Sequence, residues 1–239
     1  MALEITRAFL REFERQTGSR DAVAEPASRV LGRRYLTAAA GIAFVKPHYP
    51  FHAAYGLAED LIDNAKRAKE LAPGRSSYDF HVLHDSVARP LSDIRSHLRV
   101  SHPTTTAAGD LHLWPGPFLA PTSAPPSNPT SWESAHEDAV LLSGLATLSL
   151  PRDEQVLGSS AAHDLRVALL AGGQAITRTA TRLQARSKRP AELRDFLIDQ
   201  LHGDDGSIPF SRLLATLDAA DMAAGVASGE RVRRRRRAT

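Results

Sequence analysis

One long amphipathic helix framed by two apolar segments constrains the fold of this chain more than any other sequence feature. From Phe51 to Leu71, apolar residues recur every three or four positions, which is the spacing of a helix with one buried face. Residues 35–45 are continuously small and apolar and residues 78–83 alternate, so both segments favour strands. Gly41 and the prolines that follow argue against a helix in the first segment. We therefore predict a strand–helix–strand unit.

Helical spacing also occurs at the start of the chain and throughout its second half. The first apolar residues predict a helix over residues 2–17, whereas the polar, proline-interrupted residues 19–30 indicate a surface loop. In the second half, every periodic segment is helical. The further expected elements are a short helix at 93–100, a short strand at 111–114, and helices at 134–148, 161–183, 190–201 and 210–224.

A proline-rich segment separates the two halves. Residues 115–132 contain six prolines among serines and threonines, a composition that cannot bury a core and that is typical of a linker. We therefore divide the chain into four parts. They are an α+β domain at 1–114, a linker at 115–133, a helical domain at 134–228 and a disordered tail at 229–239.

The net charge of +3 hides an uneven distribution. Residues 1–100 carry 15 basic and 12 acidic side chains, whereas residues 101–230 carry 9 and 15, so the two parts hold +3 and −6. The tail adds +6 through six arginines, namely Arg231, Arg233, Arg234, Arg235, Arg236 and Arg237. Arg233 to Arg237 predict sequence-independent contact with RNA or DNA phosphates, and a solubilising end is an equal alternative.

The chain has no cysteine, which excludes disulfides and thiolate metal sites. No segment approaches the roughly 20 apolar residues that a membrane-spanning helix needs. The first residues are amphipathic and contain acids, unlike the apolar run of a signal peptide. We therefore expect a cytoplasmic protein without membrane contact.

The strand–helix–strand unit resembles the palm domain of nucleotide cyclases and polymerases. The segments LTAAAGIAFV, KPHYPF, AYGLAEDLIDNAKRAKE and SSYDFHVLHDS follow one another in the order that this palm requires. They are most similar to the second palm domain of the large subunit of type III CRISPR effectors, the Cas-ten/Cmr-two family. A more distant similarity is to the GGDEF diguanylate cyclase domain. The resemblance covers about residues 1–120, and the helical remainder resembles the small domain that follows the palm in the same family.

This resemblance implies a fold and a class of ligand. The fold is α+β: a partial ferredoxin-like palm, with an antiparallel sheet and helices on one face, followed by a small all-α domain. The ligand would be a nucleotide, with ATP and magnesium as candidates, in a protein linked to antiviral defence. Lys66 is the candidate nucleotide-binding residue, because the equivalent position in the family points a cation at the phosphates. The alternative is a solvated lysine beside Asp63 and Glu59.

The resemblance lacks one part of the family pattern. The family's metal-binding aspartates lie on a Gly-Gly-Asp-Asp hairpin before the helix that corresponds to residues 2–17. Two-metal phosphoryl transfer needs these carboxylates. Because no such hairpin lies upstream of Met1, we expect no catalytic residue, no metal site and no catalysis by the chain alone. The missing strands also predict an exposed sheet edge at which a partner protein can pair.

Two alternatives to this interpretation stay open. The chain could be a fragment of an active nucleotidyl cyclase or polymerase whose upstream half carries the Gly-Gly-Asp-Asp motif. It could also be a nucleic-acid-associated structural protein that acts through its arginine tail.

Several aspartates have the residue type of a catalytic site without its context. Gly203, Asp204 and Asp205 lie between two expected helices and have no apolar strands beside them, so we interpret them as a loop. Asp79 and Asp85 flank the second strand and fit strand-end and turn carboxylates better than metal ligands.

Two further groups contain the residue types of a site. They are His48, His52, His81 and His84, and Ser159, Ser160, His163 and Asp164. The histidine spacings suit zinc, but the first pair straddles Pro50 and no HExxH arrangement follows, so core or surface roles fit better. The second group lacks the Gly-x-Ser-x-Gly elbow of a hydrolase, and N-capping by its second serine explains it better.

Overall fold

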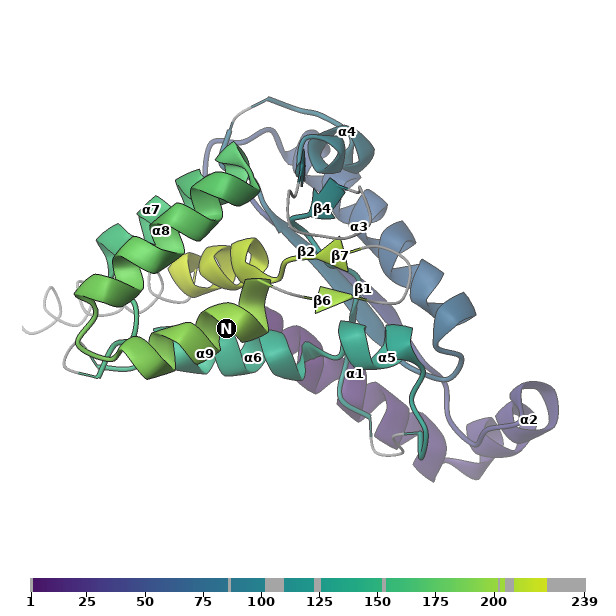
Figure 1. The fold of residues 1–239 in the computed structure, drawn as a ribbon. Helices are drawn as coiled ribbons and strands as arrows, with labels where there is room; N and C mark the ends of the chain where they lie inside the picture. The colour runs from purple at the N-terminus through teal and green to yellow at the C-terminus, as the bar shows by residue number, and fades with distance from the viewer. Residues whose placement is uncertain are drawn as a thin grey trace, which may run out of the picture.

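The protein consists of a small mixed sheet with helices on both faces and further helices beside it (Figure 1). The computed structural model describes residues 2–85, 87–101, 110–122, 126–151, 154–201, 203–204 and 209–222. The helices within these residues are α1 (Ala2–Ser19), α2 (Asp21–Leu31), α3 (Phe51–Leu71), α4 (Leu91–Ser96), α5 (Ser131–His136), α6 (Asp138–Leu148), α7 (Ser159–Ala171), α8 (Gly173–Arg186), α9 (Pro190–Leu201) and a further helix over residues 213–222. The strands are β1 (Ala39–Phe44), β2 (Ser77–Val82), β3 (Arg99–Ser101), β4 (Asp110–His112), β5 (Phe118–Leu119), β6 (Gly203–Asp204) and β7 (Pro209–Phe210).

The strand–helix–strand prediction is confirmed by β1, α3 and β2. β1 pairs with β2 in parallel, with Gly41 opposite Asp79, and β5 pairs with β2 antiparallel. The order in this sheet is β1-β2-β5. A second sheet has the order β3-β4-β7-β6. The general expectation of an α+β protein with a helical C-terminal region is therefore met.

The expectation of an antiparallel sheet with helices on one face is wrong. α3 is a crossover helix that returns the chain to the same end of the sheet, so β2 runs in the same direction as β1. Successive side chains of a strand point to opposite faces. The hydroxyl of Ser77 donates to Ala65 O of α3 on one face, while Tyr78 and Phe80 join a core that includes α1 and the C-terminal helices on the other. Figure 1 shows α3 on one side of β1 and β2, and α6 to α9 on the other.

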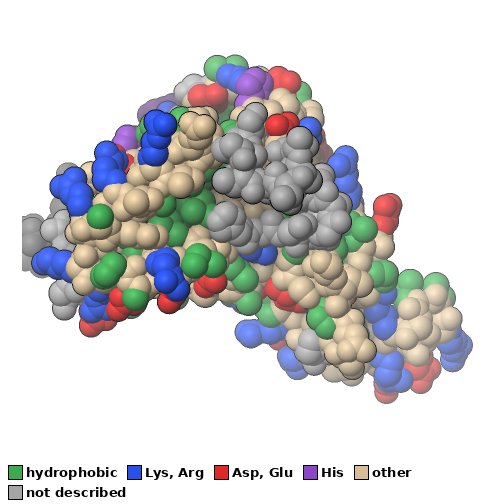
Figure 2. All heavy atoms as spheres, viewed as in Figure 1, with side chains coloured by type: hydrophobic (Ala, Val, Ile, Leu, Met, Phe, Trp, Pro, Cys, Tyr) green, Lys and Arg blue, Asp and Glu red, His purple; other side chains and the backbone are tan. Residues whose placement is uncertain are grey.

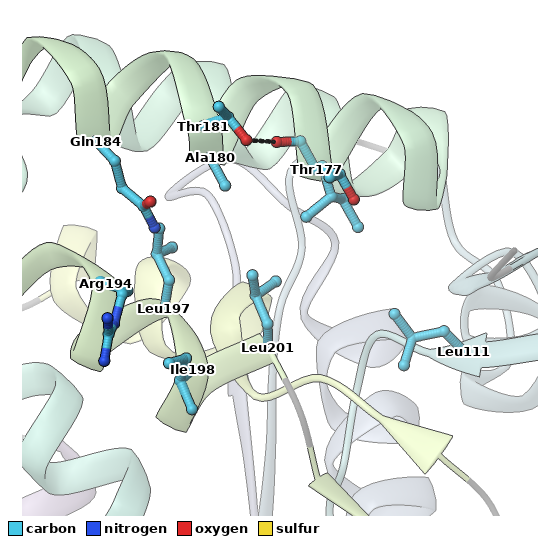
Figure 3. A pocket seen from close by; sticks show the side chains of 10 residues that line it. Leu111, Thr177, Ala180, Thr181, Gln184, Arg194, Leu197, Ile198 and Leu201 are labelled. Carbon is cyan, nitrogen blue, oxygen red and sulfur yellow. Dashed lines mark hydrogen bonds between the residues drawn. The ribbon is translucent and has the colours of Figure 1, made fainter. Parts of the chain in front are cut away.

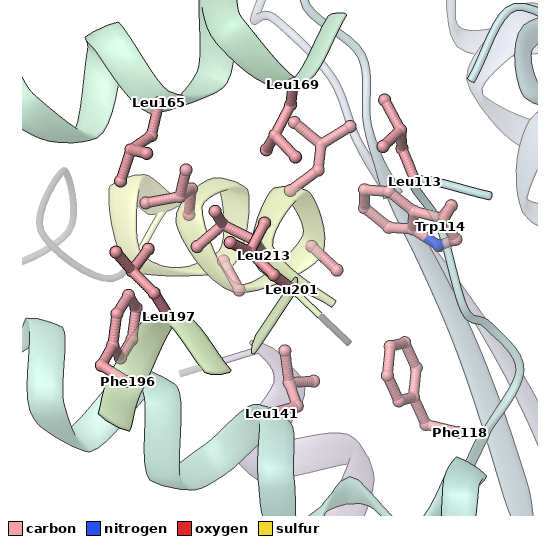
Figure 4. Packing of buried hydrophobic residues seen from close by; sticks show 14 of the residues in the cluster. Leu113, Trp114, Phe118, Leu141, Leu165, Leu169, Phe196, Leu197, Leu201 and Leu213 are labelled. Atoms are coloured by element: carbon pink, nitrogen blue, oxygen red, sulfur yellow. The ribbon is translucent and has the colours of Figure 1, made fainter. Parts of the chain in front are cut away.

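The main hydrophobic core takes residues from both predicted domains. Its members range from Leu3 of α1 to Ala219 of the last described helix, and Figure 4 shows part of this packing. Leu213 and Leu165 are fully buried and lie in one cluster with Tyr78 of β2. The ranges 1–114 and 134–228 therefore share this core.

The segment 115–133, expected to be a linker, contributes structure at both ends. Its first part forms β5, where Phe118 stacks on Tyr78 and Phe80 with ring centroids 5.7 and 5.6 Å away. Its last part begins α5, where the Thr130 side chain accepts from the Glu133 backbone in a capping box. Aromatic burial at β5 and the helix cap at α5 thus give regular structure to both ends of this proline-rich segment.

Most of residues 19–30 are helical and do not form the expected loop. α2 contains Pro26 and ends at Gly32, whose φ of 67° places it in the left-handed region. Two of its alanines, Ala24 and Ala27, are buried. Burial of this apolar side stabilises the helix even though Pro26 removes one backbone hydrogen bond.

Two long helices of the second half are each divided. The expected helix at 134–148 is replaced by α5 and α6, which meet at Glu137 in an extended conformation. The expected helix at 161–183 is divided into α7 and α8 at Gly172, whose φ is 100°. A glycine with positive φ cannot continue a right-handed helix.

The interpretation of Gly203 and Asp204 as a loop between helices is also wrong. They form β6, which pairs antiparallel with β7 through Gly203–Phe210 and Asp204–Pro209. The backbone of Ser211 donates to His112 O, which extends the contact of this hairpin with β4. Asp205 lies outside the described residues.

β1 and α3 approach closely at Gly41, and a substitution there tests this packing. A Cβ atom at Gly41 would lie 2.4 Å from Ala58 O and 2.6 Å from Ile62 N, and these are backbone atoms. We expect Gly41→Ala to lower the free energy of unfolding by about 2–3 kcal/mol, because the helix must move away from the strand. Urea unfolding monitored by circular dichroism measures this change.

Gly56→Ala provides the matched control in the same unit. A Cβ atom at Gly56 meets nothing within 4 Å, so alanine should raise the free energy of unfolding by about 0.5–1 kcal/mol through its higher helix propensity. Equal effects of the two substitutions would contradict the close contact at Gly41.

Candidate functional site

A polar cleft of about 590 Å³ lies between α3, α4 and the hairpin of β3 and β4. Its volume falls within the roughly 300–1,000 Å³ of small-molecule sites. α3 contributes Arg67, α4 contributes Arg95, β3 contributes Arg99, and the segment after β4 contributes Trp114 and Gly116. The cleft therefore brings together residues from four separate parts of the chain.

Asp79 lies beneath this cleft in the middle of β2 and is fully buried. Its Oδ1 accepts from the Phe80 backbone at 2.8 Å and from Arg95 Nη2 at 2.9 Å. Its Oδ2 accepts from Asn64 Nδ2 at 2.6 Å and from Arg95 Nη1 at 2.8 Å. Because a carboxylate offers about four lone-pair positions, Asp79 is saturated. The interpretation of Asp79 as a strand-end carboxylate is wrong, since it is the anchor that holds α3 and α4 to the sheet.

The wall of the cleft contains two buried donors without an acceptor. Both terminal nitrogens of Arg95 bind Asp79, which leaves its Nε unpaired, and Trp114 Nε1 is also unpaired within the described residues. Trp114 is only 6% exposed, and its ring lies under the Arg95 guanidinium at 5.9 Å. A buried donor without a partner costs about 1–3 kcal/mol. Both nitrogens are closed off from solvent, so a ligand would reach them only if the wall moved.

Gly116 packs tightly against this wall. A Cβ atom at this position would lie 2.3 Å from Asp79 Oδ1 and 3.2 Å from Trp114 Nε1. Any side chain at 116 would therefore collide with the buried carboxylate and crowd the indole nitrogen. In Figure 4 that nitrogen lies on the side of the Trp114 ring facing away from Leu213.

The rim of the cleft carries both signs of charge. Arg67 and Arg99 are exposed and make no hydrogen bond or ion pair within the described residues. Asp60 accepts from the Leu91 backbone at 3.0 Å, and Asp63 pairs with Lys66. Lys66 compensates the charge of Asp63, whereas Asp60 keeps its charge, so the two free guanidinium groups outnumber the one uncompensated carboxylate at the rim.

Lys66 lies outside this cleft. Its ammonium pairs with Asp63 Oδ1 at 2.9 Å, the side chain is 54% exposed, and it lines a shallower hollow of about 500 Å³ on the outer face of α3. The alternative of a solvated lysine beside Asp63 thus describes its contacts. The role of Lys66 at a nucleotide phosphate stays a prediction.

The four histidines with zinc-like spacing do not come together as a metal site. His48 and His52 are exposed, whereas His81 is buried against Trp114 with ring centroids 4.8 Å apart. His84 Nε2 pairs with Asp218 at 3.2 Å. Within the described residues, no group of three or more histidines and carboxylates could hold a metal ion.

The remaining candidates are surface residues. Asp85 is exposed and accepts from Arg89 at 3.4 Å, as a turn carboxylate would. Ser159 begins α7, and Asp164 pairs with Arg182 at 3.0 Å. The proposed N-capping by Ser160 is wrong, because the N-cap of α7 is Gly158 and no side chain caps this helix. Arg231 to Arg237 lie outside the described residues, so their contact with nucleic acid stays a prediction.

A measurement of stability against pH tests the buried environment that His81 shares with the cleft. Burial, followed by the Arg95 charge, lowers the pKa of His81 from 6.5 to about 4. Between these values the unfolded chain binds a proton that the folded chain does not, so the free energy of unfolding falls as the pH drops from 6.5 to 4. His81→Phe keeps the aromatic contact with Trp114 but cannot bind a proton. In this variant the decrease in the free energy of unfolding between pH 6.5 and 4 should be smaller by on the order of 3 kcal/mol. Urea unfolding at pH 4 to 7 measures it.

His84→Gln serves as a control of opposite sign. The hydrogen bond to Asp218 raises the pKa of His84, so its stabilisation is present below pH 6.5 and is lost as the pH rises through the folded pKa. The variant should therefore lose stability at acid pH only. An unchanged pH slope in His81→Phe would contradict the burial of a neutral imidazole.

The comparisons with known proteins do not place this chain. No protein-family model matches the sequence, and no curated protein matches it. In the described part of the chain, no helix is both long and apolar enough to cross a membrane. The geometry of the cleft is therefore the basis for a functional proposal.

Proposed function

We propose that this protein binds a nucleotide in the cleft between α3 and α4 and does not convert it. The observation that carries the proposal is the pair of exposed guanidinium groups at the rim, Arg67 and Arg99, which have no partner within the described residues. The unpaired Trp114 Nε1 and Arg95 Nε lie buried in the wall beneath them. Phosphate oxygens are acceptors that match the guanidinium donors, and arginine binds them in a planar, two-pronged geometry. The saturated Asp79 carboxylate offers no free acceptor that would repel them.

The other parts of the proposal rest on the sequence resemblance. The similarity to the CRISPR type III palm supports a nucleotide such as ATP, with or without magnesium, and a link to antiviral defence. Residues 1–239 contain no Gly-Gly-Asp-Asp motif, so the proposal for these residues is binding without turnover. A fragment of an active cyclase or polymerase is the alternative that the same resemblance supports.

Binding of ATP to the purified protein tests the cleft directly. Isothermal titration calorimetry with and without magnesium should detect binding to the wild type, and the double variant Arg67→Ala/Arg99→Ala should bind at least tenfold more weakly. Each lost charge-assisted hydrogen bond is worth about 1.5–3 kcal/mol. Arg186→Ala, an exposed arginine of α8 away from the cleft, should bind like the wild type.

Two further variants locate the site. Trp114→Phe keeps a six-membered aromatic ring but removes the unpaired donor together with the pyrrole half of the indole. It should weaken ATP binding several-fold, whereas the lost donor and the cavity left in the core change the stability of the free protein in opposite directions. Loss of binding in Lys66→Ala but not in the arginine variant would move the phosphate site to the outer face of α3. No binding by the wild type would reject the nucleotide proposal.

A second proposed property is association through β1. In the described sheet β1 is an outer strand that pairs with β2 alone, and Ala38 O faces Ser77 N of β2. Because backbone groups alternate in direction along a strand, the N–H of Ala39 points away from β2. An unpaired edge of this kind is a ready site for a strand of another protein.

Light scattering after size-exclusion chromatography measures this association. We expect the apparent mass to rise with protein concentration, and Ala39→Pro to suppress the rise because proline removes an outward N–H and leaves the pairing with β2 intact. A monomer at every concentration, in both proteins, would argue against self-association at this edge.

A further inference from the structure

An apolar groove of about 260 Å³ lies between α8, α9 and β4 (Figure 3). In Figure 1, α8 and α9 lie on the opposite side of β1 and β2 from α3. Its floor consists of Leu111, Ile176, Leu197 and Leu201, each at most 8% exposed. Figure 2 shows hydrophobic side chains in the hollow between α8 and α9. Nothing in the proposed nucleotide site uses these residues.

The wall formed by α8 is effectively apolar despite its threonines. The hydroxyl of Thr177 donates to Gly173 O at 3.0 Å, and that of Thr181 donates to Thr177 O at 2.9 Å. Figure 3 draws the second bond along the helix. Because both hydroxyl donors are satisfied within α8, neither needs a hydrogen-bond acceptor from a ligand.

Polar groups gather at one end of the groove only. Figure 3 shows the Gln184 amide and the Arg194 guanidinium at one end and Leu111 at the other. The ion pair of Arg194 with the adjacent Asp195 is long, at 3.6 Å, and both side chains are about two-thirds exposed. The Gln184 side chain has no hydrogen bond within the described residues. This end therefore offers one cation, held only by a long and exposed ion pair, and one free amide.

We propose that this groove binds a medium-chain carboxylate, with the chain on the apolar floor and the carboxylate at Arg194 and Gln184. Arg194 is the ionisable residue of the described lining, so charge complementarity selects an anionic head. At roughly 30 Å³ for each water-sized group, 260 Å³ accommodates about nine non-hydrogen atoms. Octanoate, with about ten, fills the groove when its head projects to the rim.

The ligand's charge and length are the first arm of the test. Calorimetry on the full chain should detect one octanoate per protein, with octylamine at least tenfold weaker. Hexanoate should bind about tenfold more weakly than octanoate, since each buried CH₂ changes affinity by about three- to fourfold. Decanoate should gain little, because the groove ends.

Substitutions are the second arm. Arg194→Gln should weaken octanoate at least fivefold and leave octan-1-ol unchanged. Ile198→Glu, at a half-exposed wall position that folding tolerates, should weaken octanoate at least tenfold by charge repulsion. Arg178→Gln, which changes an exposed arginine on the α7 side of α8, should have no effect.

Three results would overturn the proposal. They are no octanoate binding up to about 10 mM, which is weaker than a specific site provides, equal binding of octylamine, and binding that survives Ile198→Glu. Because the cleft variants leave α8 and α9 unchanged, failure here and failure of ATP binding are independent results.

Discussion

The buried carboxylate of Asp79 determines how the α3–α4 part of the molecule is arranged. It joins β2 to Asn64 of α3 and to Arg95 of α4 through hydrogen bonds of 2.6 to 2.9 Å. Loss of one partner from such a pair leaves a buried charge without compensation, which costs about 3–5 kcal/mol. The shape of the cleft follows from this interaction, because the fork between Arg95 and Asp79 fixes where the remaining Arg95 nitrogen and the Trp114 ring lie.

Helices and strands with a regular spacing of apolar residues could be predicted from the sequence. Elements that depend on contacts with distant parts of the chain could not. β1, α3 and β2 follow from local spacing, as does the N-terminal helix. β5 needs Tyr78 and Phe80 as packing partners, and α2 needs a surface on which its alanines are buried. The antiparallel sheet was expected from the resemblance. The crossover helix α3 instead makes β2 run parallel to β1.

The candidate site shows the same division. Asp79 attracted attention through its residue type, but its burial and its saturation depend on Asn64 and Arg95, which lie 15 and 16 positions away. Trp114 was expected at the end of a short strand, and nothing local indicates that its nitrogen has no acceptor. From the sequence, Gly116 was one residue of the expected linker, next to Pro117. Only the close approach of the Asp79 carboxylate explains why no side chain fits there.

The contacts of α1 have a consequence for synthesis of the chain. Arg7 binds Asp138 and Glu14 accepts from Thr122, across 131 and 108 positions, and Leu10 belongs to a cluster that reaches Ala219. A ribosome releases α1 long before these partners exist. The helix therefore leaves the exit tunnel with its apolar side exposed. That side stays exposed until the partner residues, which extend to Ala219, have been synthesised. The native contacts of α1 can therefore form only after the chain has been synthesised to about Ala219.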